Sequence, residues 1–240
     1  MIHEDTQDTD QALGDFQMNQ SNDAQMDHVF NNLLPKTGFE GTFAPPQPLA
    51  DRMAYYHTPG VSIAVIDEFR LAWARGVGVT DVRTQRPVTT ETRFQAGSIS
   101  KPIFALAVMR LVQEGRLDLD EDINRYLTTW RVPANGNWQP RLTLRQLLSH
   151  TAGLTVHGFP GYQTDEPLPT VAQILNGEAP ANTSKVEVNL LPGVQFRYAG
   201  GGTTVAQQLL VDLLQTPFPQ LMHELVLEPL GLHHSTYEQP

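Results

Sequence analysis

The sequence contains no cysteine and only three lysines among its 240 residues. Without cysteine the chain forms no disulfide, no thiolate-bound metal site and no cysteine nucleophile. Asp and Glu outnumber Lys and Arg by 26 to 16, which gives a formal net charge of −10 and disfavours nucleic acid as a partner. No apolar run approaches the roughly 18 residues that a membrane-spanning helix needs, so no membrane span is predicted.

The first 48 residues differ in composition from the rest of the chain. Residues 1–35 contain seven Asp or Glu residues and no Lys or Arg, and a Pro-rich connector follows at 45–48. We therefore expect 1–48 to be an acidic, mobile leader in which only Val29–Leu34 forms a short amphipathic turn or helix. A tail that binds a partner is the alternative. Because the stretch lacks a basic n-region and an apolar h-region, no secretory signal is predicted and the sequence is typical of a cytoplasmic chain.

The remaining residues, 49–240, predict one domain in which strands precede helices. Two β-branched runs separated by turn residues, Val61–Ile66 and Phe69–Val77, indicate a β-hairpin, and Thr89–Gln95 supplies a further extended run. Ser98–Gln113 is apolar nearly all round, which is typical of a buried helix. Further helices are predicted at Thr143–Ser149, with Thr143 as N-cap, at Thr203–Gln215 and at Phe218–Val226.

A serine and a lysine stand three positions apart at the start of the Ser98–Gln113 helix. Positions i and i+3 share a helix face, so Ser98 and Lys101 place a hydroxyl and an amine side by side. A serine hydroxyl attacks a carbonyl when an adjacent base takes its proton, and a lysine in buried surroundings can be that base. The pair therefore predicts a nucleophilic serine. Taken alone, a capping serine beside a solvated lysine is the alternative.

Three sequence blocks, beginning with this pair, resemble the serine β-lactamase and penicillin-binding-protein superfamily. They are Gly97-Ser98-Ile-Ser-Lys101-Pro, Leu144-Arg-Gln-Leu-Leu-Ser-His-Thr-Ala-Gly-Leu154 and Phe196-Arg-Tyr198-Ala-Gly200-Gly-Gly, in the order that the family uses. The resemblance runs from about Val61 to Tyr237. It looks most like the branch with class C β-lactamases, D-stereospecific peptidases and family VIII esterases. The three blocks together are much more specific than the serine–lysine pair.

The resemblance implies an α/β (α+β) serine hydrolase with the β-lactamase/DD-peptidase-like fold, in which helices flank an antiparallel sheet. Ser98 would attack an ester, amide or lactam carbonyl of a small-molecule substrate, Lys101 and Tyr198 would move the proton, and water would release the acyl group. The backbone N–H of Ser98 would form half of the oxyanion hole. No cofactor or metal is implied, and the oligomeric state stays open. Because the family is often periplasmic or secreted, the compartment stays open as well.

Gly200 departs from the pattern of the family, which often has asparagine two residues after the tyrosine. We expect Gly200 and Gly201 to lie in a flexible active-site loop that contacts the substrate. Since glycine offers no side-chain amide to an acyl amide, this departure favours an ester substrate. A D-aminopeptidase or DD-peptidase and a β-lactamase proper are the alternatives.

The family's third block, a Lys-Thr-Gly or His-x-Gly type triplet on a late strand, has no counterpart after Tyr198. Lys36-Thr37-Gly38 precedes the serine and lies in the leader, so it is not that block. We therefore expect 49–240 to be an incomplete β-lactamase-like domain, with the C-terminal strands missing. A catalytically incomplete fragment or a non-catalytic scaffold is the alternative from another functional class.

The spacing of other residues gives less support for a catalytic, metal or anion site. His150, in the second block, is expected to have a structural role at a helix end. His223 and Glu224 do not form a zinc-protease motif, because Leu227 occupies the position of the second histidine. The run Gly200–Gly202 before a helix is only a weak signal for anion binding, because no Lys-Ser/Thr follows it.

Overall fold

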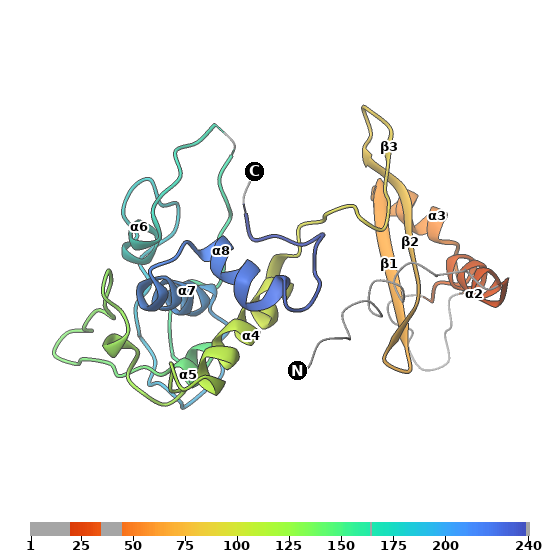
Figure 1. Cartoon of the computed structure of the whole chain (residues 1–240). Coiled ribbons are helices and arrows are strands. Elements are labelled where there is room, and N and C mark those ends of the chain that lie inside the picture. Colours follow the sequence, from red (N-terminus) through yellow and green to blue (C-terminus); the bar gives the residue numbers. More distant parts are fainter. Residues whose placement is uncertain (1–19, 35–44, 164, 239–240) are drawn as a thin grey trace, which may run out of the picture. The chain divides into compact units, whose positions relative to one another are not determined.

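The computed structural model describes residues 20–34, 45–163 and 165–238 and divides the chain into two compact units. The first unit ends at Phe94 and the second begins at Gln95. In Figure 1 the labelled strands belong to the first unit and the helices from α4 onward to the second. Within the described residues, no helix is both long enough and apolar enough to cross a bilayer.

The described residues of the first unit form two helices and a three-stranded antiparallel sheet (Figure 1). Its elements are α2 (Gln20–Asn31), α3 (Leu49–Tyr55), β1 (Gly60–Asp67), β2 (Arg70–Asp81) and β3 (Arg86–Pro87). The predicted hairpin is confirmed as β1–β2, with Gly60 opposite Gly78 and a register shift between Val65 and Ile66. Its β-branched runs favour extended backbone, and the hairpin buries Trp73 on β2.

Helix α2 packs on the sheet through one aromatic pair. The ring of Phe30 meets that of Trp73 edge to face, with centroids 5.9 Å apart. The helix expected at Val29–Leu34 therefore exists, but it begins earlier than the apolar residues indicate, at Gln20. The other parts of the predicted leader, 1–19 and 35–44, lie outside the described residues.

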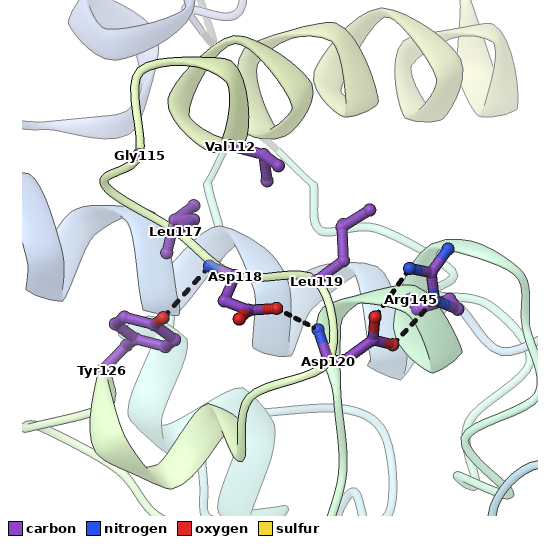
Figure 2. A pocket seen from close by; sticks show the side chains of 8 residues that line it. All are labelled: Val112, Gly115, Leu117, Asp118, Leu119, Asp120, Tyr126 and Arg145. Atoms are coloured by element: carbon purple, nitrogen blue, oxygen red, sulfur yellow. Dashed lines mark hydrogen bonds and ion pairs between the residues drawn. The ribbon is translucent and has the colours of Figure 1, made fainter.

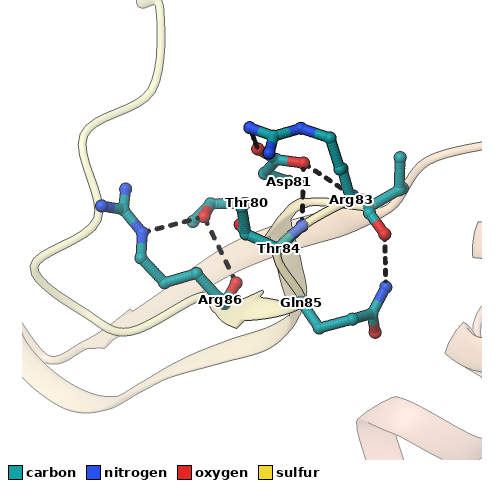
Figure 3. Close-up of polar contacts among 7 residues, drawn as sticks. Thr80, Asp81, Arg83, Thr84, Gln85 and Arg86 are labelled. Atoms are coloured by element: carbon teal, nitrogen blue, oxygen red, sulfur yellow. Dashed lines mark hydrogen bonds and ion pairs between the residues drawn. The ribbon is translucent and has the colours of Figure 1, made fainter.

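A turn without glycine connects β2 to β3 (Figure 3). The Asp81 carboxylate accepts hydrogen bonds from the backbone N–H groups of Arg83 and Thr84 at 2.7 and 3.2 Å. These two bonds stabilise the turn without a glycine. The Thr80 hydroxyl donates to the carbonyl of Arg86 and accepts from its Nε. Pro87 ends this short strand, where a missing N–H is tolerated.

The extended run predicted at Thr89–Gln95 is not a strand. The Thr92 hydroxyl accepts the N–H of Thr89 at 2.8 Å, and the Thr89 hydroxyl accepts the N–H of Glu91 at 3.2 Å. These hydrogen bonds from the backbone to nearby hydroxyls stabilise a turn, and they replace the hydrogen bonds that a β-strand would form with a neighbouring strand. The third strand is Arg86–Pro87 instead.

The second unit is helical. It contains η1 (Gly97–Ile99), α4 (Ser100–Gln113), η2 (Ile123–Arg125), α5 (Leu144–Leu148), α6 (Val171–Asn176), α7 (Gly200–Leu214), α8 (Phe218–Met222) and the π-helical turn η3 (His223–Leu227). Helix α7 contacts α5, α6 and α8 and contributes many of the fully buried side chains. The predicted helices are thus present. Thr143 caps α5 as predicted, within a capping box that includes Gln146.

Helix α4 is buried on one face only, whereas the sequence predicts burial nearly all round. Phe104, Ala107, Val108 and Leu111 form the buried face. On another face, Leu106 is 47% exposed within the described residues. The buried positions follow the i, i+3, i+4, i+7 spacing of a helix that packs on one side only.

A buried carboxylate joins α7 to the segment after η2. Asp212, only 5% exposed, accepts the N–H groups of Thr128 and Thr129, the Thr129 hydroxyl and the Gln208 amide, at 2.7 to 2.9 Å. Burial raises the pKa of Asp212, but the bonds from Thr129 and Thr128 outweigh it, so the pKa lies below its usual value. The ionised carboxylate therefore stabilises the fold.

We expect Asp212→Asn to lower the free energy of unfolding by about 2 to 4 kcal/mol, because an amide nitrogen would replace one of two oxygens that each accept two hydrogen bonds in a buried site. Since the pKa of Asp212 is lowered in the folded state, its contribution is present at neutral pH and is lost as the pH falls through that pKa. Urea denaturation of both proteins at several pH values measures the difference. The exposed Asp165→Asn is the control, and a difference that persisted unchanged in acid would contradict this role.

Candidate active site

Ser98 and Lys101 are brought together at the junction of η1 and α4, as their spacing predicts. Lys101 Nζ donates to Ser98 Oγ at 3.1 Å. Gly97, just before the serine, has φ of +53°, a conformation that glycine adopts without steric cost. This backbone turn places Ser98 before the first residue of α4 with its hydroxyl beside the lysine.

Tyr198 reaches the same hydroxyl from 100 residues further along the chain. Its phenol donates to Ser98 Oγ at 2.8 Å, and Lys101 Nζ lies 5.2 Å from the centroid of its ring. The structure thus assembles the three residues that the sequence proposes for nucleophile and proton transfer. Ser98 Oγ accepts hydrogen bonds from both of its proposed partners.

The setting of the pair is more open than the sequence predicts. Ser98 is exposed and Lys101 is partly buried, although burial of the pair was expected. The reason is that η1 and the first turn of α4 lie at the mouth of a cavity. Full burial begins only at Phe104, one helical turn further on.

Electrostatics favour the ionised form of Tyr198. Interaction with the Lys101 ammonium group, and next with the Ser98 hydroxyl, lowers the pKa of Tyr198 below its ordinary value. A phenol with a lowered pKa exchanges its proton more readily near neutral pH. The geometry therefore suits transfer of the serine proton by Lys101 and Tyr198.

Two histidine rings contact Tyr198. The centroid of His150 lies 4.3 Å and that of His157 lies 5.0 Å from the centroid of the phenol ring. His150 follows α5, in the position expected for a helix-end residue, but it also touches the candidate site. Sequence reasoning missed His157, because a lone histidine in a loop carries no signal of its own.

The cavity beside Ser98 has a volume of about 710 Å³ and an aromatic side. Phe218 packs against Phe104 and against Tyr237, with ring centroids 5.6 and 5.4 Å apart. The Tyr237 phenol donates to the carbonyl of Ser100 at 2.7 Å, and burial raises its pKa to about 12. Tyr237 is therefore a neutral, structural wall of the cavity. Thr203, Thr204 and Gln207 of α7 add polar groups to the lining.

Gly200 and Gly201 form the first turn of α7, although a flexible loop was predicted. The N–H of Gly200 donates to the His157 carbonyl at 2.9 Å, and that of Gly201 to the Val156 carbonyl at 3.0 Å. These bonds to a neighbouring segment order the turn and occupy two donors that an anion would need. A Cβ on Gly200 would lie 3.0 Å from the His157 carbonyl oxygen, so a side chain at this position would need that carbonyl to shift by a few tenths of an ångström. Gly200 lines the cavity, whereas the buried Gly201 is not among the lining residues.

A second cavity of about 470 Å³ lies at the end of α4 (Figure 2). Arg145 donates to both carboxylate oxygens of Asp120 at 2.7 Å, and the Tyr126 hydroxyl accepts the N–H of Asp118 at 3.1 Å. The bond from Arg145 lowers the pKa of Asp120. Because these groups satisfy one another, the second cavity is a structural junction rather than a reacting site.

Known proteins resemble this chain in sequence and in structure. The family model described as Beta-lactamase matches residues 47–240. Protein flp of Staphylococcus aureus strain MW2 is 25% identical over 183 residues, which are 76% of this chain and 36% of flp. Esterase EstB of Burkholderia gladioli is 39% identical over 84 residues, which are 35% of this chain and 21% of EstB. The octameric penicillin-binding protein homologue from Pyrococcus abyssi is similar over 77% of this chain and 42% of its own, with a TM-score of 0.62 and 26% identity.

These similarities confirm the resemblance predicted from the three sequence blocks and the predicted fold class, helices with an antiparallel sheet. The chain spans about a third of the length of flp.

Proposed function

The chain belongs to the β-lactamase family, and on this premise we propose that it is a serine hydrolase that forms an acyl-enzyme at Ser98 and prefers esters to lactams. The observation that carries the proposal is the pair of hydrogen bonds that Ser98 Oγ accepts from Lys101 and Tyr198 at the mouth of a cavity. A hydroxyl held between two proton-transfer groups is the arrangement that nucleophilic catalysis requires.

The proposed reaction has two halves. Ser98 Oγ forms a bond to the substrate carbonyl carbon while its proton passes to Lys101 in its neutral amine form or to Tyr198 in its ionised form, and the ester C–O bond then breaks as the alcohol leaves with that proton. A water molecule attacks the acyl-enzyme with the same groups as base, which releases the acid and restores Ser98. The N–H of Ser98 is proposed as one donor to the oxyanion.

The lining of the cavity supports an ester with an apolar acyl group. The aromatic side, formed by Phe104, Phe218 and Tyr237, offers apolar surface within reach of Ser98. Gly200 presents no amide that would hold the acyl amide of a penicillin or a peptide. Peptidase and lactamase activities use the same chemical steps, and the absent amide disfavours both.

We expect p-nitrophenyl butyrate to be hydrolysed with a larger kcat/KM than the lactam nitrocefin. Loss of one good hydrogen bond in a sheltered site weakens transition-state binding of the lactam by about 1 to 3 kcal/mol, roughly ten- to hundredfold in rate. Absorbance assays of the two substrates on the same protein preparation measure the ratio. Faster hydrolysis of nitrocefin would refute the ester preference, and turnover of neither substrate would favour the alternative of a catalytically incomplete fragment or a non-catalytic scaffold.

A further inference from the structure

His150 holds the chain on both sides of Tyr198. Its carbonyl oxygen accepts the N–H of Arg197 at 2.8 Å, and its ring Nδ1 accepts the N–H of Ala199 at 3.3 Å. Its ring also lies against the phenol, inclined by 35°. One residue thus contacts the peptide before the tyrosine, the peptide after it and the tyrosine ring itself.

The backbone of His150 is in an unusual conformation that accompanies these contacts. Its φ is +55°, in the left-handed region that residues other than glycine rarely adopt, with asparagine, aspartate and histidine the most tolerant. The end of α5 determines this conformation, because His150 follows the C-cap residue Ser149: its N–H donates to the Leu147 carbonyl at 3.3 Å, and the N–H of Thr151 donates to the Gln146 carbonyl at 2.9 Å. The helix end thereby fixes the His150 backbone, from which the carbonyl reaches Arg197 and the ring reaches Ala199.

The bond to Ala199 requires a neutral imidazole. A ring that accepts at Nδ1 carries its proton on Nε2, and protonation of Nδ1 would turn this acceptor into a donor facing another donor. The titratable or charged groups around the ring are Lys101 of α4, Tyr198, the neighbouring Arg197 and, against the same phenol, His157. Burial, and next the charge of Lys101, lower the pKa of His150, so the ring is neutral at neutral pH.

From these contacts we infer that His150 is a positioning residue, which keeps the Tyr198 phenol within hydrogen-bond distance of Ser98. The inference rests on the proposed function, in which Tyr198 transfers the serine proton. His150 is not among the residues that line the cavity, so it acts through Tyr198 and not through contact with substrate.

Two substitutions distinguish the effect of the hydrogen-bond acceptor of His150 from the effect of its aromatic ring. His150→Phe keeps an aromatic ring against the phenol but leaves the N–H of Ala199 without its acceptor. His150→Asn tolerates the left-handed backbone and places a side-chain oxygen near the position of Nδ1. We expect His150→Phe to lower kcat for p-nitrophenyl butyrate by about ten- to hundredfold, with KM nearly unchanged, because small displacements of a reacting group have effects of this size. His150→Asn is expected to stay within about tenfold of the original protein.

The pH profile offers a readout that a merely structural role would not alter. In the original protein, kcat should fall on the acid side as His150 is protonated, at a pH below the ordinary histidine range. This acid limb should be absent from His150→Asn. The surface variant His223→Asn is the control for loss of a histidine and should leave the limb in place.

The positioning role of His150 can also be tested without substrate, and therefore independently of the proposed function. NMR titration of ¹³C-labelled tyrosine reports the pKa of Tyr198, which should move back toward its ordinary value in His150→Phe as the phenol leaves Ser98 and Lys101. Thermal unfolding of each variant identifies any that fails to fold. If His150→Phe is folded and retains the kcat and the Tyr198 pKa of the original protein, the positioning role is wrong. If the original protein shows no esterase activity while the Tyr198 pKa still responds to His150→Phe, the proposed function fails and the positioning role stands.

Discussion

Ser98→Ala is expected to abolish covalent labelling by a fluorophosphonate and to lower ester hydrolysis by about 10⁴- to 10⁶-fold, the range seen when a serine nucleophile is removed. The physical reason is that alanine leaves Lys101 and Tyr198 without an oxygen from which to take a proton. Peptide mass spectrometry of the labelled protein locates the adduct. The peptide that carries Ser98 also carries Ser100, which serves as an internal control.

The exposed Ser235→Ala, outside the cavity, is the matched control and should leave labelling and hydrolysis unchanged. Labelling that persisted in Ser98→Ala would assign the nucleophile to another residue. An original protein that is folded but never labelled would favour the alternative of a catalytically incomplete fragment or a non-catalytic scaffold.

Local sequence signals predicted the elements that local interactions determine. The β1–β2 hairpin follows from two β-branched runs around a turn, and α5 follows from its capping box at Thr143. The β2–β3 turn escaped prediction because it relies on the Asp81 side chain rather than on glycine. Thr89–Gln95 was predicted wrongly because threonine favours strands on average, but here the hydroxyls of Thr89 and Thr92 accept N–H groups of neighbouring residues.

The candidate site was predictable to different degrees for different residues. Ser98 and Lys101 are three positions apart, so helix geometry alone brings them together. Tyr198 lies 100 residues away, and only the family resemblance singled it out. The contacts of His150 depend on how the segment after α5 folds against residues 197–199, which no local pattern records. Likewise, the predicted loop at Gly200 is helical because carbonyls of a distant segment accept its first N–H groups.

Tyr198→Phe is expected to lower kcat for p-nitrophenyl butyrate by about 10²- to 10⁴-fold, the usual contribution of a general acid or base. Phenylalanine keeps a ring beside His150 and Lys101 but removes the hydroxyl that donates to Ser98. The loss therefore isolates proton transfer from packing. Stopped-flow measurement of p-nitrophenol release separates acylation from deacylation, and both steps should slow.

The role of Tyr198 in proton transfer also predicts how the hydrolysis rate changes with pH. Of the two forms of Tyr198, only the ionised phenol can accept the serine proton, so the part of the rate that depends on Tyr198 should rise with pH as Tyr198 ionises. Since Lys101, and next Ser98, lower the pKa of Tyr198, this rise should come at a lower pH than for an ordinary tyrosine, and Tyr198→Phe should lack it. Tyr126→Phe, which removes a phenol bonded to the N–H of Asp118 in the second cavity, is the matched control and should keep the rise. A Tyr198→Phe protein with the original rate and the original pH profile would leave Lys101 as the sole base, because proton transfer would then not pass through the phenol.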